Sequence, residues 1–173
     1  MPLAQALPRS AVSHSVVREG AIAGALGATA VAVWFLAVDV IAGHPLRTPE
    51  VLGRALFSVL GPSGMEGAIS FVAAYTIFHY VVFAAVGTLA VVIVHWSEKE
   101  PAVLAGFVIL FVAAELGFYG LVGLLSQPLI LGDVAWYQVM IGNLLAAGIM
   151  GWYLWRQHPQ LGHDFDHALS GRE

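Results

Sequence analysis

The sequence predicts an all-α, polytopic membrane protein with four transmembrane helices and one short interfacial amphipathic helix. Three observations lead to this fold class. Of the 173 residues, 59% are hydrophobic and only 10% are charged, whereas soluble chains carry about 25% charged residues. Four apolar runs are each long enough to cross a bilayer core, which takes about 20 residues. The segments between the runs are short and rich in turn-forming or charged residues.

The four predicted transmembrane helices cover residues 20–43, 68–95, 101–125 and 133–156. The chain therefore divides into an N-terminal segment, residues 1–19, a helical domain, residues 20–156, and a C-terminal tail, residues 157–173. The first apolar run has about 23 residues, longer than the core of a signal peptide, which has about 7 to 15. It is therefore interpreted as an uncleaved anchor.

Residues 48–60 predict the short amphipathic helix. Thr48 is a suitable N-cap and Pro49 suits the first helical position, while a Gly-Pro pair follows the helix. One face is apolar at helical spacing, and the other carries Glu50 and Arg54 as an i,i+4 pair. At about 18 Å the helix is too short to span a bilayer. We expect it to lie along the outer membrane surface with its apolar face down.

The distribution of Lys and Arg predicts the orientation. With four crossings, both termini and the loop 96–100 lie on one side, and the short helix lies on the other. Cytoplasmic segments carry an excess of Lys and Arg, so both termini are expected in the cytoplasm. The side with the termini and the loop 96–100 carries Arg9, Arg18, Lys99, Arg156 and Arg172. The side with the short helix carries Arg47 and Arg54.

The candidate functional residues are the few polar groups inside the predicted spans. Intramembrane ionisable groups usually face a bundle interior, a cavity or a partner. At about 1.5 Å per residue, three of the polar residues lie near mid-depth, with two tyrosines one turn outward and an aspartate near the outer boundary. Such a ladder could carry protons or hold the head group of a quinone or another lipid-soluble ligand. Its members are His79, Glu115 and Asn143, then Tyr75 and Tyr119, then Asp39.

Each of these polar residues also has a purely structural interpretation. Asn143 shares its helix face with Ala147 and Gly151, which is consistent with an interhelical hydrogen bond. His79 also shares its face with small residues. Asp39 is close enough to the outer boundary to be hydrated or to pair with an arginine, either Arg47 or Arg54. In that interpretation it anchors the end of the first helix, and the short helix folds back over it.

The predicted helix 101–125 indicates contact with other protein. Glycine and alanine form one face, and Glu115 lies roughly opposite among bulky apolar side chains. An acid in bare lipid at the centre of a helix costs about 2.5 to 3.5 kcal/mol. Whichever face packs inside the bundle, the other therefore requires a neighbour. Further interface candidates are Phe57, which interrupts the polar face of the short helix, and the small residues Gly20 and Gly24, whose four-residue spacing lets helices approach closely.

The sequence argues against several other classes of function. A net charge of −4 without a long basic run makes nucleic acid an unsuitable partner. There is no Ser-His-Asp motif, P-loop or GxGxxG, so no catalytic residue is predicted. A membrane b-haem needs two histidines at matching depth, and only His79 is placed there. The histidines of the tail HPQLGHDFDH are interpreted as solvated. No metal or cofactor is predicted, while a bound quinone or lipid is possible.

One pattern of residues in the first third of the chain comprises Trp34, Phe35, Asp39, Gly43, Pro45, Thr48, Pro49, Leu52 and Gly53. In this pattern the chain resembles small bacterial inner-membrane proteins with four helices and no assigned activity. The resemblance implies a bacterial inner-membrane location and implies no activity.

Two functional hypotheses follow. The leading one is a non-catalytic accessory subunit of a larger bacterial membrane complex of the energy-converting kind, with other integral membrane subunits and lipids as partners. The alternative is a stand-alone membrane protein in which His79 and Glu115 form an intramembrane site. That site would bind a quinone or lipid, or relay protons.

Overall fold

The structure is a computed structural model that describes residues 9–60, 67–97, 103, 107, 108, 112 and 136–158. The helices formed by these residues are α1 (Arg9–Ile41), α2 (Arg47–Leu60), α3 (Ala68–Ser97) and α5 (Trp136–Gln157). The predicted all-α class is thus confirmed over the described residues. The predicted helix 101–125, with Glu115 and Tyr119, lies mostly outside the described residues.

Two of the described helices are long and apolar enough to cross a membrane. They are Ser15–Ile41 within α1 and Ala68–Ser97, which is α3. In the most apolar part of each, only 28% and 22% of the residues are buried inside the protein. The prediction of four crossings is not confirmed. α5 has 22 residues, but Gln138, Asn143 and its aromatic ends make it less apolar than the other two.

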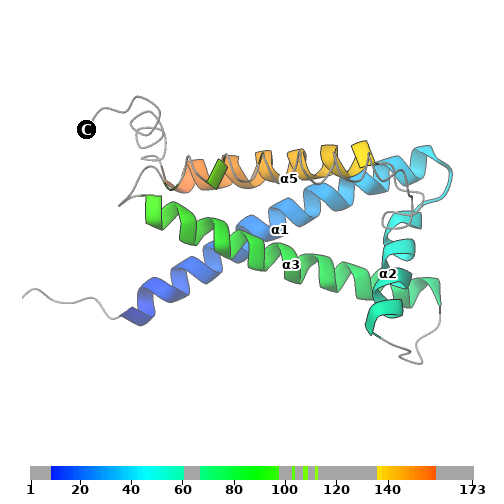
Figure 1. Ribbon diagram of the computed structural model, residues 1–173, viewed down its shortest axis with the longest axis horizontal. Coiled ribbons are helices and arrows are strands. Elements are labelled where there is room, and N and C mark those ends of the chain that lie inside the picture. The colour runs from blue at the N-terminus through cyan, green and yellow to red at the C-terminus, as the bar shows by residue number, and fades with distance from the viewer. Residues whose placement is uncertain are drawn as a thin grey trace, which may run out of the picture.

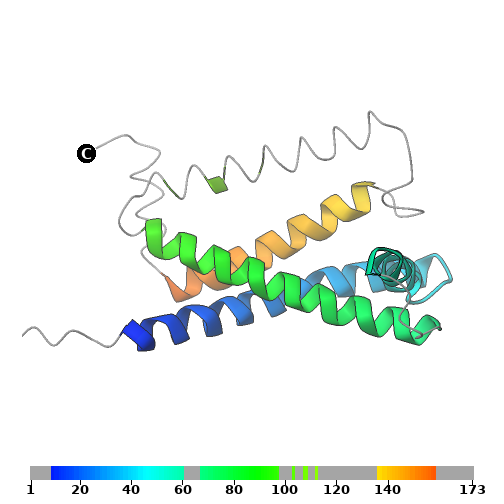
Figure 2. The same cartoon turned by 60° about the horizontal axis from the view of Figure 1, so that its bottom comes forward.

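The long helices form a crossed arrangement with α2 at one end. Figure 1 shows α1 and α3 crossing near their middles, with α5 beside α1. Figure 2 views α2 nearly along its axis, so α2 runs across the long helices. It joins the C-terminal end of α1 to the N-terminal end of α3 and packs mainly on α3. At this end of the molecule α2 therefore bridges the gap between two diverging helices.

Glycines allow the close contact where α1 and α3 cross. A Cβ atom on Gly20 would come within 3.0 Å of the Thr88 backbone, and one on Gly24 would meet the backbone of Phe83 equally closely. From α3, Gly87 fits against Gly20 and Gly24 in the same way. The predicted close approach of a helix at Gly20 and Gly24 is confirmed. The helix that approaches is α3 of the same chain.

The apolar core lies between α1, α3 and α5, toward the Ser97 end of α3. Its buried members include Ala23 of α1, Val91 of α3 and Met150 of α5. Toward the other end of α5, the indole N–H of Trp34 donates a hydrogen bond of 2.8 Å to the carbonyl oxygen of Gln138. Packing and this polar contact together hold α5 against α1.

The corner between α1 and α2 follows from local sequence. Gly43 adopts a φ of +78°, a left-handed conformation that glycine tolerates without steric cost. Its N–H donates to the carbonyl oxygen of Val40 at 3.0 Å, and the N–H of His44 donates to that of Asp39 at 2.9 Å. This pair of bonds is a Schellman motif, which satisfies the last carbonyls of a helix. Pro45 follows at once and prevents the helix from continuing.

Candidate functional site

Asp39 joins the end of α1 to the start of α2. Its Oδ2 atom accepts a hydrogen bond of 2.8 Å from the backbone N–H of Thr48, and its Oδ1 atom accepts one of 2.7 Å from the Thr48 hydroxyl. Asp39 and Thr48 are only 5% and 6% exposed. A carboxylate at a helix N-terminus also interacts favourably with the helix dipole. Asp39 therefore caps α2 from the preceding helix.

The hydrogen bonds at the start of α2 differ from the sequence prediction. The helix begins at Arg47, whose N–H donates to the carbonyl oxygen of His44 at 3.1 Å. Pro49 has no N–H, and the N–H of Glu50 donates to the carbonyl oxygen of Leu46 at 3.1 Å. Every N–H of the first turn is thus accounted for. Thr48, predicted to be the N-cap, instead donates to the capping carboxylate.

The predicted pair on the polar face of α2 is confirmed. Arg54 lies 2.9 Å from the carboxylate of Glu50. Arg54 therefore has a partner on its own helix, and the alternative pairing of Arg54 with Asp39 is not observed. The predicted anchoring of the helix end by Asp39 is confirmed, with Thr48 as the partner.

His79 connects α3 to α1. Its Nε2 atom lies 3.1 Å from the carbonyl oxygen of Ala28. A carbonyl oxygen only accepts, so Nε2 carries the proton and donates it. The imidazole ring also lies 5.7 Å from the ring of Tyr75, in a stacked arrangement, and 4.7 Å from the ring of Phe83. The ring is therefore held in one orientation by its hydrogen bond and by its aromatic neighbours.

A cavity of about 270 Å³ lies between α1 and α3, next to the start of α2. It brings together three residues that the sequence predicted as site candidates, Asp39, Tyr75 and His79. Two further lining residues, Thr29 and Tyr80, were not predicted. The Thr29 hydroxyl donates to the carbonyl oxygen of Ala25 at 2.7 Å, so the Tyr80 hydroxyl donates the bond of 2.9 Å that joins it to Thr29. This bond links the two helices at one end of the cavity.

The cavity opens on the face of α1 that points away from α5. The α5 side of α1 is marked by Gly27, which faces Met150, and by Trp34, which bonds to α5. At 100° per residue, Val33 and Leu36 lie away from that side. These two lining residues are 60% and 43% exposed. The opening is therefore a lateral one between two long helices.

Two other predicted residues lie elsewhere. Asn143 is on α5, where it is half-buried, and does not line the cavity. Phe57 packs edge-on against Phe71 of α3, with 5.5 Å between the ring centroids, and Arg54 lies over the same Phe71 ring at 5.2 Å. Phe57 thus has a protein contact, and that contact is within the chain.

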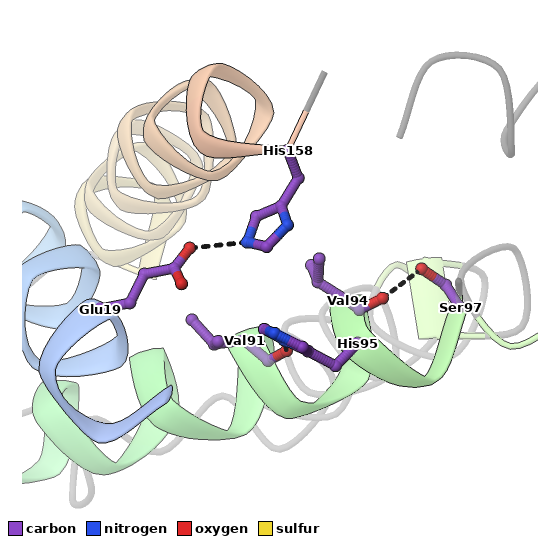
Figure 3. Close-up of polar contacts among 6 residues, drawn as sticks. All are labelled: Glu19, Val91, Val94, His95, Ser97 and His158. Carbon is purple, nitrogen blue, oxygen red and sulfur yellow. Dashed lines mark hydrogen bonds and ion pairs between the residues drawn. The ribbon is translucent and has the colours of Figure 1, made fainter. Parts of the chain in front are cut away.

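A second polar cluster joins three helices at the end of the molecule away from α2. It was not predicted, and it shows that the interpretation of the tail histidines as solvated is wrong for His158, whose side chain is only 16% exposed. Figure 3 shows Glu19 of α1 and His158, which follows α5, pointing toward each other. The Glu19 Oε1 and His158 Nε2 atoms are 2.7 Å apart, and the ring of His95 lies 5.2 Å from that of His158. Glu19 and His158 are 139 residues apart, so no local spacing could reveal the pair. Among the residues that the structure describes, no group of three or more His, Asp or Glu could hold a metal ion.

Comparison with models of protein families, with curated proteins and with solved structures finds no match for this chain.

Proposed function

We propose that this chain is a multi-pass membrane protein that binds a lipophilic ligand in the cavity between α1 and α3. The observation that carries the proposal is the cavity itself, which Asp39, Tyr75 and His79 line within mainly apolar walls. Ligand sites are typically apolar concavities with a few placed polar groups, and they have volumes of about 300 Å³ or more. A cavity slightly below that range suits a head group whose apolar remainder extends through the lateral opening.

The surface of the long helices supports membrane insertion. Large apolar side chains are exposed along α3, among them Ile77 at 67% and Val81 at 62%. Soluble monomers rarely expose extended apolar surface, and the core helix of a soluble protein would be mostly buried. In a bilayer these side chains contact lipid, and a ligand dissolved in the same lipid reaches the opening beside Val33 and Leu36 directly.

The full proposed topology has four crossings in a bacterial inner membrane, with both termini in the cytoplasm. It is supported by the distribution of Lys and Arg and by exposed tryptophans near the ends of the helices, such as Trp96 and Trp155. Because the chain contains no Cys, single cysteines can report the topology without background. A membrane-impermeant maleimide should label Arg54→Cys in intact cells, but Ser15→Cys and Arg156→Cys only after permeabilisation. Labelling of Arg156→Cys in intact cells would contradict four crossings.

The test of the ligand site is to fill the cavity. Ala32 lines it, whereas Ala25 lies seven residues earlier on nearly the same face of α1 and does not. Both alanines are exposed, which makes Ala25→Trp a matched control for Ala32→Trp. The measurement is the amount of lipophilic compound that co-purifies per protein in mild detergent, determined by mass spectrometry. We expect the amount of compound bound per protein to fall at least about tenfold in Ala32→Trp and to stay unchanged in Ala25→Trp. Equal retention of the compound by both variants would overturn the proposal.

An accessory subunit of an energy-converting membrane complex is the second candidate function. The observation that favours it is the composition of the segment 101–125. If this segment is the helix that the sequence predicts, Glu115 and a face of small residues both require protein neighbours. Purification from native membranes in mild detergent, followed by mass spectrometry, tests it. Stoichiometric recovery of other integral membrane subunits would support an accessory role, and recovery of the chain alone would contradict it.

A further inference from the structure

We infer that the cavity selects a ligand whose head group donates a hydrogen bond, and that it binds a quinol more tightly than the corresponding quinone. The inference rests on the proposed function of the cavity and specifies its ligand class. It depends on the hydrogen-bonding state of His79, on the neighbouring Tyr75 and on the charge of the lining residues.

The bond between His79 and Ala28 fixes what His79 can offer to a ligand. Because Nε2 donates its proton to the Ala28 carbonyl oxygen at 3.1 Å, the Nδ1 atom of the neutral ring carries a lone pair and acts as an acceptor. The described residues provide no hydrogen-bond donor to Nδ1. A hydroxyl group placed there donates a hydrogen bond, whereas a carbonyl oxygen would oppose one lone pair to another.

Tyr75 lies one helical turn from His79 and completes the polar end of the site. Its ring stacks on the imidazole at 5.7 Å, and both residues line the cavity. A tyrosine hydroxyl can donate or accept, so Tyr75 pairs with either redox form of a quinone. Of these two residues, His79 is therefore the one that distinguishes the two forms.

The charge of the lining residues restricts the ligand further. The described residues around the cavity include the carboxylate of Asp39 and no Lys or Arg. A phosphate or carboxylate head group would enter without a cationic partner and would be repelled by Asp39. A neutral, hydroxyl-bearing ring with an apolar tail meets both conditions, and the tail leaves through the opening beside Val33 and Leu36.

Preferential binding of the quinol has a redox consequence. A site that binds the reduced form more tightly raises the midpoint potential of the bound couple. For a two-electron couple, each tenfold difference in affinity corresponds to about 30 mV. The cavity would therefore stabilise the quinol against oxidation to the quinone.

The first test compares decylubiquinol with decylubiquinone on the full chain in phosphatidylcholine nanodiscs, by equilibrium binding. Leaving an acceptor unpaired once the ligand shields it from water costs about 1 to 3 kcal/mol, and about 1.4 kcal/mol is tenfold in affinity. We therefore expect the quinol to bind about tenfold more tightly. Equal affinities, or tighter binding of the quinone, would overturn the inference.

The second test removes the acceptor. His79→Phe keeps an aromatic ring beside Tyr75 and Phe83 but has no Nδ1, so the ratio of the two affinities should fall to about one. His95→Phe is the matched control. His95 also lies on α3 and donates a ring N–H to a backbone carbonyl, that of Val91 at 2.9 Å, but it does not line the cavity. A quinol preference that persists in His79→Phe would overturn the role of His79.

The cavity-filling variant separates this inference from its premise. If Ala32→Trp weakens both forms while the wild type shows no preference, the ligand site stands and the quinol selectivity is wrong. If neither form binds the wild type, or if Ala32→Trp binds both as well as the wild type does, the cavity is not the site, and the inference fails together with the proposed function.

Discussion

The same two helices, α1 and α3, meet in two different ways along their length. Where they cross, Gly24 and Gly87 bring the backbones so close that a single added methyl group would collide. Toward α2 the helices diverge (Figure 1), and His79, Tyr75 and Tyr80 stand between them and leave a cavity. Close contact needs residues without side chains, whereas a cavity needs side chains large enough to hold the backbones apart.

This difference indicates how stability and binding are divided within one helix pair. The crossing provides backbone contact that excludes ligand and lipid, and dispersion in such contacts is a main source of helix association in membranes. The divergent half is held at its edges by hydrogen bonds, Asp39 to Thr48 on one side and Tyr80 to Thr29 on the other. The crossing should therefore be sensitive to added volume, and the divergent half to the loss of polar partners.

The largest effect is expected from adding volume at the crossing. In Gly24→Leu the new side chain would meet the backbone of Phe83 and Ala84, which can move only if α3 moves. We expect a loss of about 3 kcal/mol in the free energy of unfolding, measured by titration with SDS in mixed micelles. Gly148→Leu on α5 is the control, because among the described residues no heavy atom beyond its own stretch of helix lies within 4 Å of its Cβ position. Equal stability of the two variants would show that the crossing is not tightly packed.

A smaller effect is expected from removing the cap that holds the divergent half. Asp39→Ala leaves the buried N–H and hydroxyl of Thr48 without their acceptor, at a cost of about 2 kcal/mol. Thr48→Val keeps the N–H bond and should cost about 1 kcal/mol. The same SDS titration measures both, and hydrogen exchange of the first turn of α2 should accelerate more in Asp39→Ala. Unchanged exchange there would contradict capping by Asp39.

The smallest effect is expected at the hydrogen bond between Tyr80 and Thr29. This bond is exposed, and hydrogen bonds between membrane helices contribute about 0.6 kcal/mol on average. A double-mutant cycle of Tyr80→Phe and Thr29→Val should give a coupling energy near that value. A coupling energy of zero would mean that the bond of 2.9 Å between Tyr80 and Thr29 does not stabilise the contact between the two helices.

Much of the helical organisation could be predicted from local sequence. The predicted span 68–95 corresponds to α3, Ala68–Ser97, and the predicted short helix 48–60 corresponds to α2, Arg47–Leu60. The predicted spans 20–43 and 133–156 overlap α1 and α5, but α1 already begins at Arg9. The length of an apolar run predicts a helix, and glycine and proline predict where a helix ends. Each of these signals depends on residues that are close together in the sequence, so each can be recognised without a structure.

The candidate site could be predicted only in part. Polar residues inside apolar runs are costly wherever they lie, which is why Asp39, Tyr75 and His79 could be identified without a structure. Their partners could not, because the hydrogen bond of His79 is to a backbone carbonyl, that of Ala28. A backbone carbonyl occurs in every residue, and so leaves no mark in the sequence.

By itself, then, the sequence determined the all-helical class, the short helix after the first span and three of the polar residues that line the cavity, Asp39, Tyr75 and His79. Only the tertiary structure decided that Asp39 caps α2, that Glu19 meets His158, and that α1 and α3 part to leave a cavity beside α2. The physical reason is range. Helix formation and turn chemistry depend on neighbours within one or two turns, whereas a cavity and its hydrogen bonds depend on how distant helices cross.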